Sequence, residues 1–126
     1  MSTQEILDRM RESTSGCRVS ALGDLESGLV LRASSVAPCP REQLDDLAAS
    51  AQSVFEVARA MGTDLAAGSS HGTVAITFCA EKSDVFVRPT ADSEEFAAAR
   101  LDPASAMQAA VKGIQQDAQA FVGDSE

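Results

Sequence analysis

An amphipathic helix in the middle of the chain constrains the fold more than any other feature. Residues 44–62, "LDDLAASAQSVFEVARAMG", repeat apolar side chains at spacings of three and four. In an α-helix this spacing forms one apolar face. That face comprises Leu44, Leu47, Ala51, Val54, Ala58 and Met61, with Ala48 and Phe55 widening it. We predict that this helix covers one side of a sheet.

The opposite side of the same helix carries small side chains. At about 100° per residue, it gathers Ala49, Ser53, Val57 and Ala60. One interpretation is that Ala and Ser are tolerated on a solvated face because Ala favours helix formation. The other is that the small residues let a second helix approach to about 8–10 Å. A twofold axis would then pair the helix with its own copy, as in the commonest oligomers.

Five strand candidates flank this helix. Residues 17–35, "CRVSALGDLESGLVLRASS", are two apolar runs around a turn-forming "GDLESG", which predicts a hairpin. After the helix, three further strands are predicted at 74–80, 84–89 and 94–101, separated by short polar segments.

A helix is expected at each end of the chain. Ser2 and Glu5 form a capping box before an apolar stripe. Asp102 is suited to cap the last helix, and Pro103 to open it. This helix carries apolar residues at spacings of four and three, namely Met107, Val111, Ile114, Ala118 and Phe121.

The order of elements is therefore helix-β-β-helix-β-β-β-helix. It predicts an α+β domain with a five-stranded, mainly antiparallel sheet and helices on its faces. We expect a short N-terminal helix over residues 1–13, the domain over 14–121 and a frayed tail over 122–126.

Charge narrows the possible partners. The chain has 126 residues and a net charge of -9, from 19 acidic and 10 basic residues. Nucleic acid and anionic lipid need Lys and Arg patches, so neither is an expected partner, and a basic protein surface is more natural. No segment approaches the ~20 apolar residues of a membrane span. With no signal peptide in view, we expect a cytoplasmic protein without membrane insertion.

The sequence offers little catalytic chemistry. Cys17, Cys39 and Cys79 are odd in number and widely spaced, which favours neither a disulfide framework nor a zinc site. We expect reduced thiols, with Cys39 the most exposed. His71 lies in a Gly/Ser-rich connection without a nucleophile nearby, and this connection lacks the lysine of a phosphate loop. We therefore expect no catalytic residue, no cofactor and no metal, and thus no enzyme.

Arginines recur on the strand candidates. They are Arg18, Arg32, Arg88 and Arg100. They could form a row that meets acidic partners, but solvated side chains with apolar stems are the simpler interpretation. The chain has no Trp or Tyr, which largely excludes aromatic hot spots and base-stacking platforms.

Taken together, these segments resemble a known family. The hairpin "SALGDLESGLVLRASS", the helix, "VAITFCAEKSDVFVRPTADSEEFAAARLDP" and the terminal helix are similar to the roadblock/dynein light-chain family, especially its bacterial members. The resemblance covers about residues 14–121. Its most specific parts are the strand at 28–31, the strand end at 87–89 and the segment 101–103 before the last helix.

The resemblance implies a profilin-like roadblock fold and a non-enzymatic homodimer. In such a dimer the central helices pair and the third strands join edge to edge. Carried onto this sequence, the dimer interface would comprise Ala49, Ser53, Val57 and Ala60 on the helix, and Val74, Ile76 and Phe78 on the strand.

The resemblance also implies a function. Family members act as scaffolds or regulators of Ras-like small GTPases, and some bacterial ones also belong with a sensor kinase. The GTPase usually docks on the paired helices, which here would offer Asp45, Asp46, Gln52, Glu56 and Arg59. No arginine finger is implied. The alternative is a kinase-associated signalling scaffold or sensory module that does not contact a GTPase.

Overall fold

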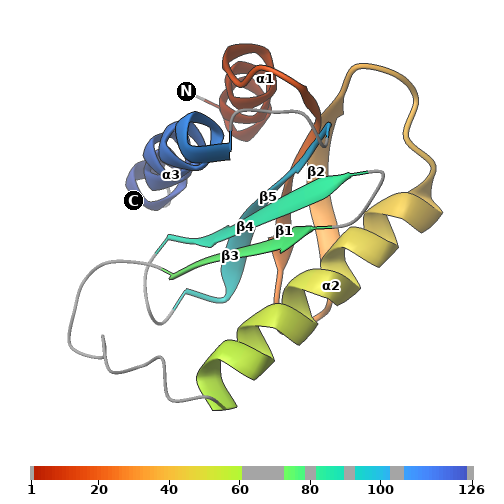
Figure 1. Ribbon diagram of the computed structural model, residues 1–126, viewed down its shortest axis with the longest axis vertical. Helices are drawn as coiled ribbons and strands as arrows, with labels where there is room; N and C mark the ends of the chain where they lie inside the picture. The colour runs from red at the N-terminus through yellow and green to blue at the C-terminus, as the bar shows by residue number, and fades with distance from the viewer. Residues whose placement is uncertain (1, 61–72, 79–81, 90–92, 103–106, 125–126) are drawn as a thin grey trace.

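A computed structural model describes residues 2–60, 73–78, 82–89, 93–102 and 107–124 (Figure 1). The helices are α1 (Thr3–Ser13), α2 (Arg41–Ala60) and α3 (Met107–Asp124). The strands are β1 (Cys17–Asp24), β2 (Leu29–Ser35), β3 (Thr73–Phe78), β4 (Ser83–Arg88) and β5 (Glu95–Leu101). The sequence-based expectations for His71, Cys79 and Pro103 fall outside the described residues, as do the side chains of Arg59 and Phe78.

The five strands form one antiparallel sheet in the order β2-β1-β5-β4-β3. This confirms the predicted α+β fold and its element order. β1 lies inside the sheet because it pairs with β2 on one side and with β5 on the other. The hairpin between β1 and β2 turns through Gly28, whose φ of 69° is a conformation that favours glycine.

Helices cover both faces of the sheet (Figure 1). α1 and α3 lie on one face, and their buried side chains share a core with that side of the strands. Ile6, Leu7 and Met10 of α1 are fully buried, so the N-terminal helix belongs to the core of the domain. None of the helices in the described part of the chain is both long and apolar enough to cross a membrane.

α2 lies on the other face, where it contacts mainly β2 and β5. Its buried residues are Leu47, Ala48, Ala51 and Phe55, as the apolar spacing of the sequence predicted. They pack on a core that includes Phe86 and Phe96 of the sheet. The apolar stripe is therefore confirmed from Leu44 to Phe55 as the face that covers the sheet, whereas Met61 and the side chain of Ala58 lie outside the described residues.

Helix ends differ in part from those expected. The Ser2–Glu5 capping box is present. α2 begins at Arg41, three residues before Leu44, because Pro40 already accepts the first backbone hydrogen bond of the helix. The backbone of α3 stays helical to Asp124, past the expected end at residue 121. Such terminal residues are the least specified by sequence, since helix ends fray and are weakly capped.

The two edges of the sheet differ in regularity. The β1–β2 register shifts between Leu22 and Gly23, where Leu31 is the extra residue of a bulge. The side-chain amide of Gln4 also donates to the backbone oxygen of Ala33, 3.3 Å away. By contrast, β3 pairs with β4 in unbroken register over its whole length. Bulges and covering groups discourage edge pairing, so β3 is the edge better suited to accept another strand.

Gly23 leaves room for the ring of a core phenylalanine. A Cβ at this position would lie 2.4 Å from Cζ of Phe96 and 3.0 Å from the backbone oxygen of Leu29. Since Phe96 is fully buried, we predict that Gly23→Ala lowers the free energy of unfolding by about 1–3 kcal/mol. The midpoint of urea-induced unfolding measures this loss.

Gly113→Ala is the matched control. A Cβ there meets only Thr14 Oγ1, at 4.0 Å, and the residue is helical. Alanine should raise stability there by up to about 1 kcal/mol. Equal midpoints for the two variants would contradict the close packing of Phe96 on Gly23.

Candidate protein interface

The small-residue side of α2 is open to solvent. Ala49, Ser53, Val57 and Ala60 are all exposed, and Val57 is 56% exposed. Their exposure is what helical geometry predicted. Their pairing with a second copy of the chain stays a prediction.

A groove of about 390 Å³ runs beside this stripe. Because α2 contacts mainly β2 and β5, the side toward β3 is left open. Residues on α2, on β3 and at the start of β4 line the groove, namely Ala49, Ser50, Ser53, Val54, Thr77, Lys82 and Asp84. The small-residue stripe and the β3 edge thus border the same hollow.

The predicted strand residues face away from α2. Val74 and Ile76 pair with Val87 and Val85, which lie in the core under α1 and α3. Val74 packs against that core, and Ile76 remains 36% exposed. These residues and the α2 stripe can therefore share one interface only through the β3 edge between them.

A buried ion pair forms the charged end of the groove. Arg100 on β5 donates to both carboxylate oxygens of Asp84 on β4, at 2.9 and 3.2 Å. The side chains of Asp84 and Arg100 are only 5% and 12% exposed. Burial opposes the charge of Arg100, but Asp84 and then Asp46 outweigh it and raise the pKa of the guanidinium. The expectation of a solvated Arg100 is therefore wrong.

Asp46 extends this ion pair to the helix. Its Oδ2 lies 3.5 Å from Nη2 of Arg100 and 3.7 Å from Nζ of Lys82. The sequence did not reveal the set because its members come from separate elements. The only available signal was an Asp and an Arg on neighbouring strands, which become cross-strand partners once the β4–β5 register is known.

The other predicted partner-binding residues have varied surroundings. Asp45 is exposed and pairs with Arg41 one helical turn away, at 3.2 Å. Glu56 is exposed. Gln52 is exposed but donates its side-chain amide to the backbone oxygen of Leu25, 2.8 Å away. The predicted set therefore includes both surface carboxylates and a residue already bonded within the chain.

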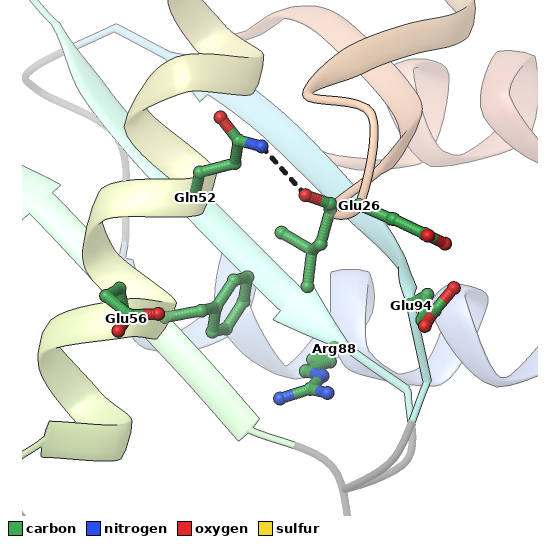
Figure 2. A pocket seen from close by; sticks show the side chains of 7 residues that line it. Glu26, Gln52, Glu56, Arg88 and Glu94 are labelled. Atoms are coloured by element: carbon green, nitrogen blue, oxygen red, sulfur yellow. Dashed lines mark hydrogen bonds between the residues drawn. The ribbon is translucent and has the colours of Figure 1, made fainter.

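A second recess, of about 440 Å³, opens on the other flank of α2 (Figure 2). It lies between α2, the β1–β2 turn, the end of β4 and the start of β5. Its lining is Leu25, Glu26, Gln52, Phe55, Glu56, Arg88 and Glu94. The sequence carries no signal that Glu26, Arg88 and Glu94 meet, because a turn and two strand ends bring them together.

Glu26 and Arg88 have opposite effects on the pKa of Glu94 in this recess. The side chain of Glu26 interacts with Glu94, and this interaction, followed by the charge of Glu26, raises the pKa of Glu94. Arg88 acts in the other direction on Glu94. Its Nε donates to the backbone oxygen of Ser93 at 2.6 Å, which fixes the guanidinium near the carboxylates.

The two cysteines in the described part of the chain are free thiols. Cys17 and Cys39 are free, as expected, and Cys39 is the more exposed of the two. Burial raises the pKa of the Cys17 thiol to about 11, which keeps it protonated. Within the described residues, no three His, Cys, Asp or Glu side chains gather in a way that could hold a metal ion.

Comparison with known proteins gives matches to solved structures alone. No protein-family profile matches the sequence, and no curated protein matches it. A roadblock/LC7 domain from Streptomyces avermitilis is similar, with a TM-score of 0.76 and 13% identity, over 98% of this chain and 97% of that one. An MglB in a tetrameric arrangement has a TM-score of 0.74 and 22% identity, over 95% of this chain and 85% of that one. The gliding protein MglB of Thermus thermophilus has a TM-score of 0.63 and 19% identity, over 93% of this chain and 88% of that one.

The fold thus places the chain in a class of small α+β domains with a five-stranded antiparallel sheet between helices. More specifically, it is the roadblock/LC7 fold, since the match extends over nearly the whole of both chains. The resemblance seen in the sequence is confirmed at the level of the fold.

The Asp84–Arg100 pair supplies a test of the charged groove. Removing one partner of a buried ion pair leaves the other charge buried without that partner. Asp84→Ala should therefore lower the free energy of unfolding by about 3 kcal/mol. Replacing both, as Asp84→Leu with Arg100→Met, should restore most of that loss, because an apolar pair avoids the cost of desolvation. Urea unfolding of the two variants makes the comparison. A double variant as unstable as Asp84→Ala would contradict the ion-pair interpretation.

Proposed function

We propose that this chain is a non-enzymatic, homodimeric adaptor of the bacterial cytoplasm that binds a Ras-like small GTPase through the face formed by paired α2 helices. The observation that carries the proposal is the exposed small-residue stripe of α2, which borders a groove beside the regular β3 edge.

The dimer part of the proposal follows from packing. An exposed stripe of Ala and Ser allows close approach of a second helix, and Val57 on it leaves a large apolar side chain in water. β3 is free of the bulge that interrupts β2. A twofold axis at the β3 edge would join the sheets and bring the α2 helices together. Val74, Ile76 and Phe78 would then belong to the strand junction.

The GTPase part rests on charge and on resemblance. Asp45 and Asp46 are paired with basic residues of this chain, but α2 carries four carboxylates against two arginines, and this negative excess suits a basic protein surface. The roadblock fold implies such a partner, and one similar structure is named a gliding protein. The adaptor would act by binding one nucleotide state of the GTPase more tightly, since a ligand shifts an equilibrium only by its differential affinity.

A substitution on the stripe tests the dimer. Ser53→Glu should place like charges face to face across the twofold axis and yield monomers in sedimentation, with the circular dichroism spectrum unchanged. Gln115→Glu on the exposed side of α3 adds the same charge away from the interface and should leave the dimer intact. If Ser53→Glu sediments at the same mass as the control, the stripe is not the interface.

Binding to a small GTPase tests the partner. We expect this protein to bind the GDP and GTP-analogue forms of a Ras-like GTPase from the same genome with dissociation constants that differ at least ~5-fold, a coupling of about 1 kcal/mol. Glu56→Lys should weaken the tighter complex without changing the dimer mass. Titration calorimetry measures both effects. Equal constants would exclude regulation and leave scaffolding, whereas no binding would favour the kinase-associated scaffold or sensory module.

A further inference from the structure

The β1–β2 turn is tied to its surroundings on two sides. The backbone oxygen of Leu25 accepts a hydrogen bond from the side-chain amide of Gln52 on α2, at 2.8 Å (Figure 2). The backbone nitrogen of Leu25 donates to the backbone oxygen of Glu94, at 2.6 Å. Within the turn, Gly28 N donates to the oxygen of Asp24 at 2.9 Å. The backbone of this turn is thus joined to the middle of α2 and to the start of β5.

Gly28 allows Gln52 to reach the turn. A Cβ on Gly28 would lie 2.8 Å from both the oxygen and the nitrogen of the Gln52 amide. The residue also has a φ of 69°, which side chains disfavour. The Gln52 amide therefore packs against the backbone of Gly28, and it hydrogen-bonds to the turn rather than pointing outward.

This contact brings Glu26 to the rim of the recess beside α2. Glu26 is exposed and lines the same recess as Glu56 and Glu94. The negative face of α2 thereby continues onto the turn. The half-buried Leu25 in the same lining offers apolar surface of the kind that the stems of Lys and Arg cover.

We propose that Gln52 is a positioning residue, which holds the β1–β2 turn in the partner-docking face, and that a basic surface of the partner contacts this turn together with Glu56. The inference rests on the proposed function and extends the docking surface from one helix to a helix and a turn. Charge complementarity selects the partner: the described lining of the recess holds Glu26, Glu56 and Glu94 against the single guanidinium of Arg88, and this excess of carboxylates suits a basic surface.

Gln52→Glu distinguishes positioning from direct contact, because the two roles predict opposite signs. A carboxylate cannot donate to the Leu25 oxygen and is repelled by it, so a positioning role predicts weaker binding of the GTPase. Loss of one hydrogen bond of about 1 kcal/mol corresponds to a ~5-fold rise in the dissociation constant. A direct contact with a basic partner would instead tighten with the added negative charge.

Gln52→Met supplies the uncharged comparison. It keeps the length of the side chain and removes only the amide, so it should weaken binding in the same direction as Gln52→Glu. Both variants should sediment as the wild-type dimer. Amide hydrogen exchange should quicken at Gly28 in both, which reports release of the turn independently of partner binding.

Charge reversal tests the turn itself. Glu26→Lys should raise the dissociation constant of the GTPase complex, and added salt should narrow the difference from wild type. Glu12→Lys makes the same change on α1, on the opposite face of the sheet, and should bind as wild type does. Glu26→Lys equal to Glu12→Lys, or Gln52→Glu tighter than wild type, would overturn the inference. The proposed function would stand in that case if Glu56→Lys still weakens the complex, and both would fail if the wild-type protein binds no GTPase.

Discussion

The packing of α2 across only part of the sheet is the constraint on which the rest of the structure depends. Its apolar residues bury Phe86 and Phe96, while its contacts fall mainly on β2 and β5. A single helix is about 10 Å wide with its side chains, whereas five strands span about 19 Å between the outer strand axes. One helix cannot cover such a face. The uncovered part lies toward β3, and the groove and the regular sheet edge both follow from it.

The ion pair at this uncovered end is a consequence of the same geometry. β4 and β5 present Phe86 and Phe96 beneath α2, and farther along they present Asp84 and Arg100. A charged pair on an apolar face costs desolvation, which its bidentate hydrogen bonds offset. Apolar residues in place of Asp84 and Arg100 would leave a larger hydrophobic surface in water whenever the groove is empty. The pair therefore suits a face that is open to solvent in the single chain.

Much of the fold could be predicted because it depends on local patterns. The α2 stripe, the β1–β2 turn and the Ser2 capping box are periodicity or turn chemistry within one segment, and all three are present. The site depends on register instead. Asp84 meets Arg100 only after β4 and β5 align, and Glu26 meets Glu94 only after the turn folds onto β5. Pairings between distant segments leave no trace in the spacing of either segment.

Gln52 shows how helical position alone can mislead about role. Its place on α2 is on the exposed side, so a helical wheel assigns it to solvent or to a partner. A glutamine is long enough to reach around the helix, however, and the bare backbone at Gly28 lets it bond to the turn. A carboxylate acts on a partner through its charge at a distance, whereas an amide acts only at contact. An exposed amide that is already bonded within the chain can therefore act on a partner only through the group that it holds in place, which is the role we propose for Gln52.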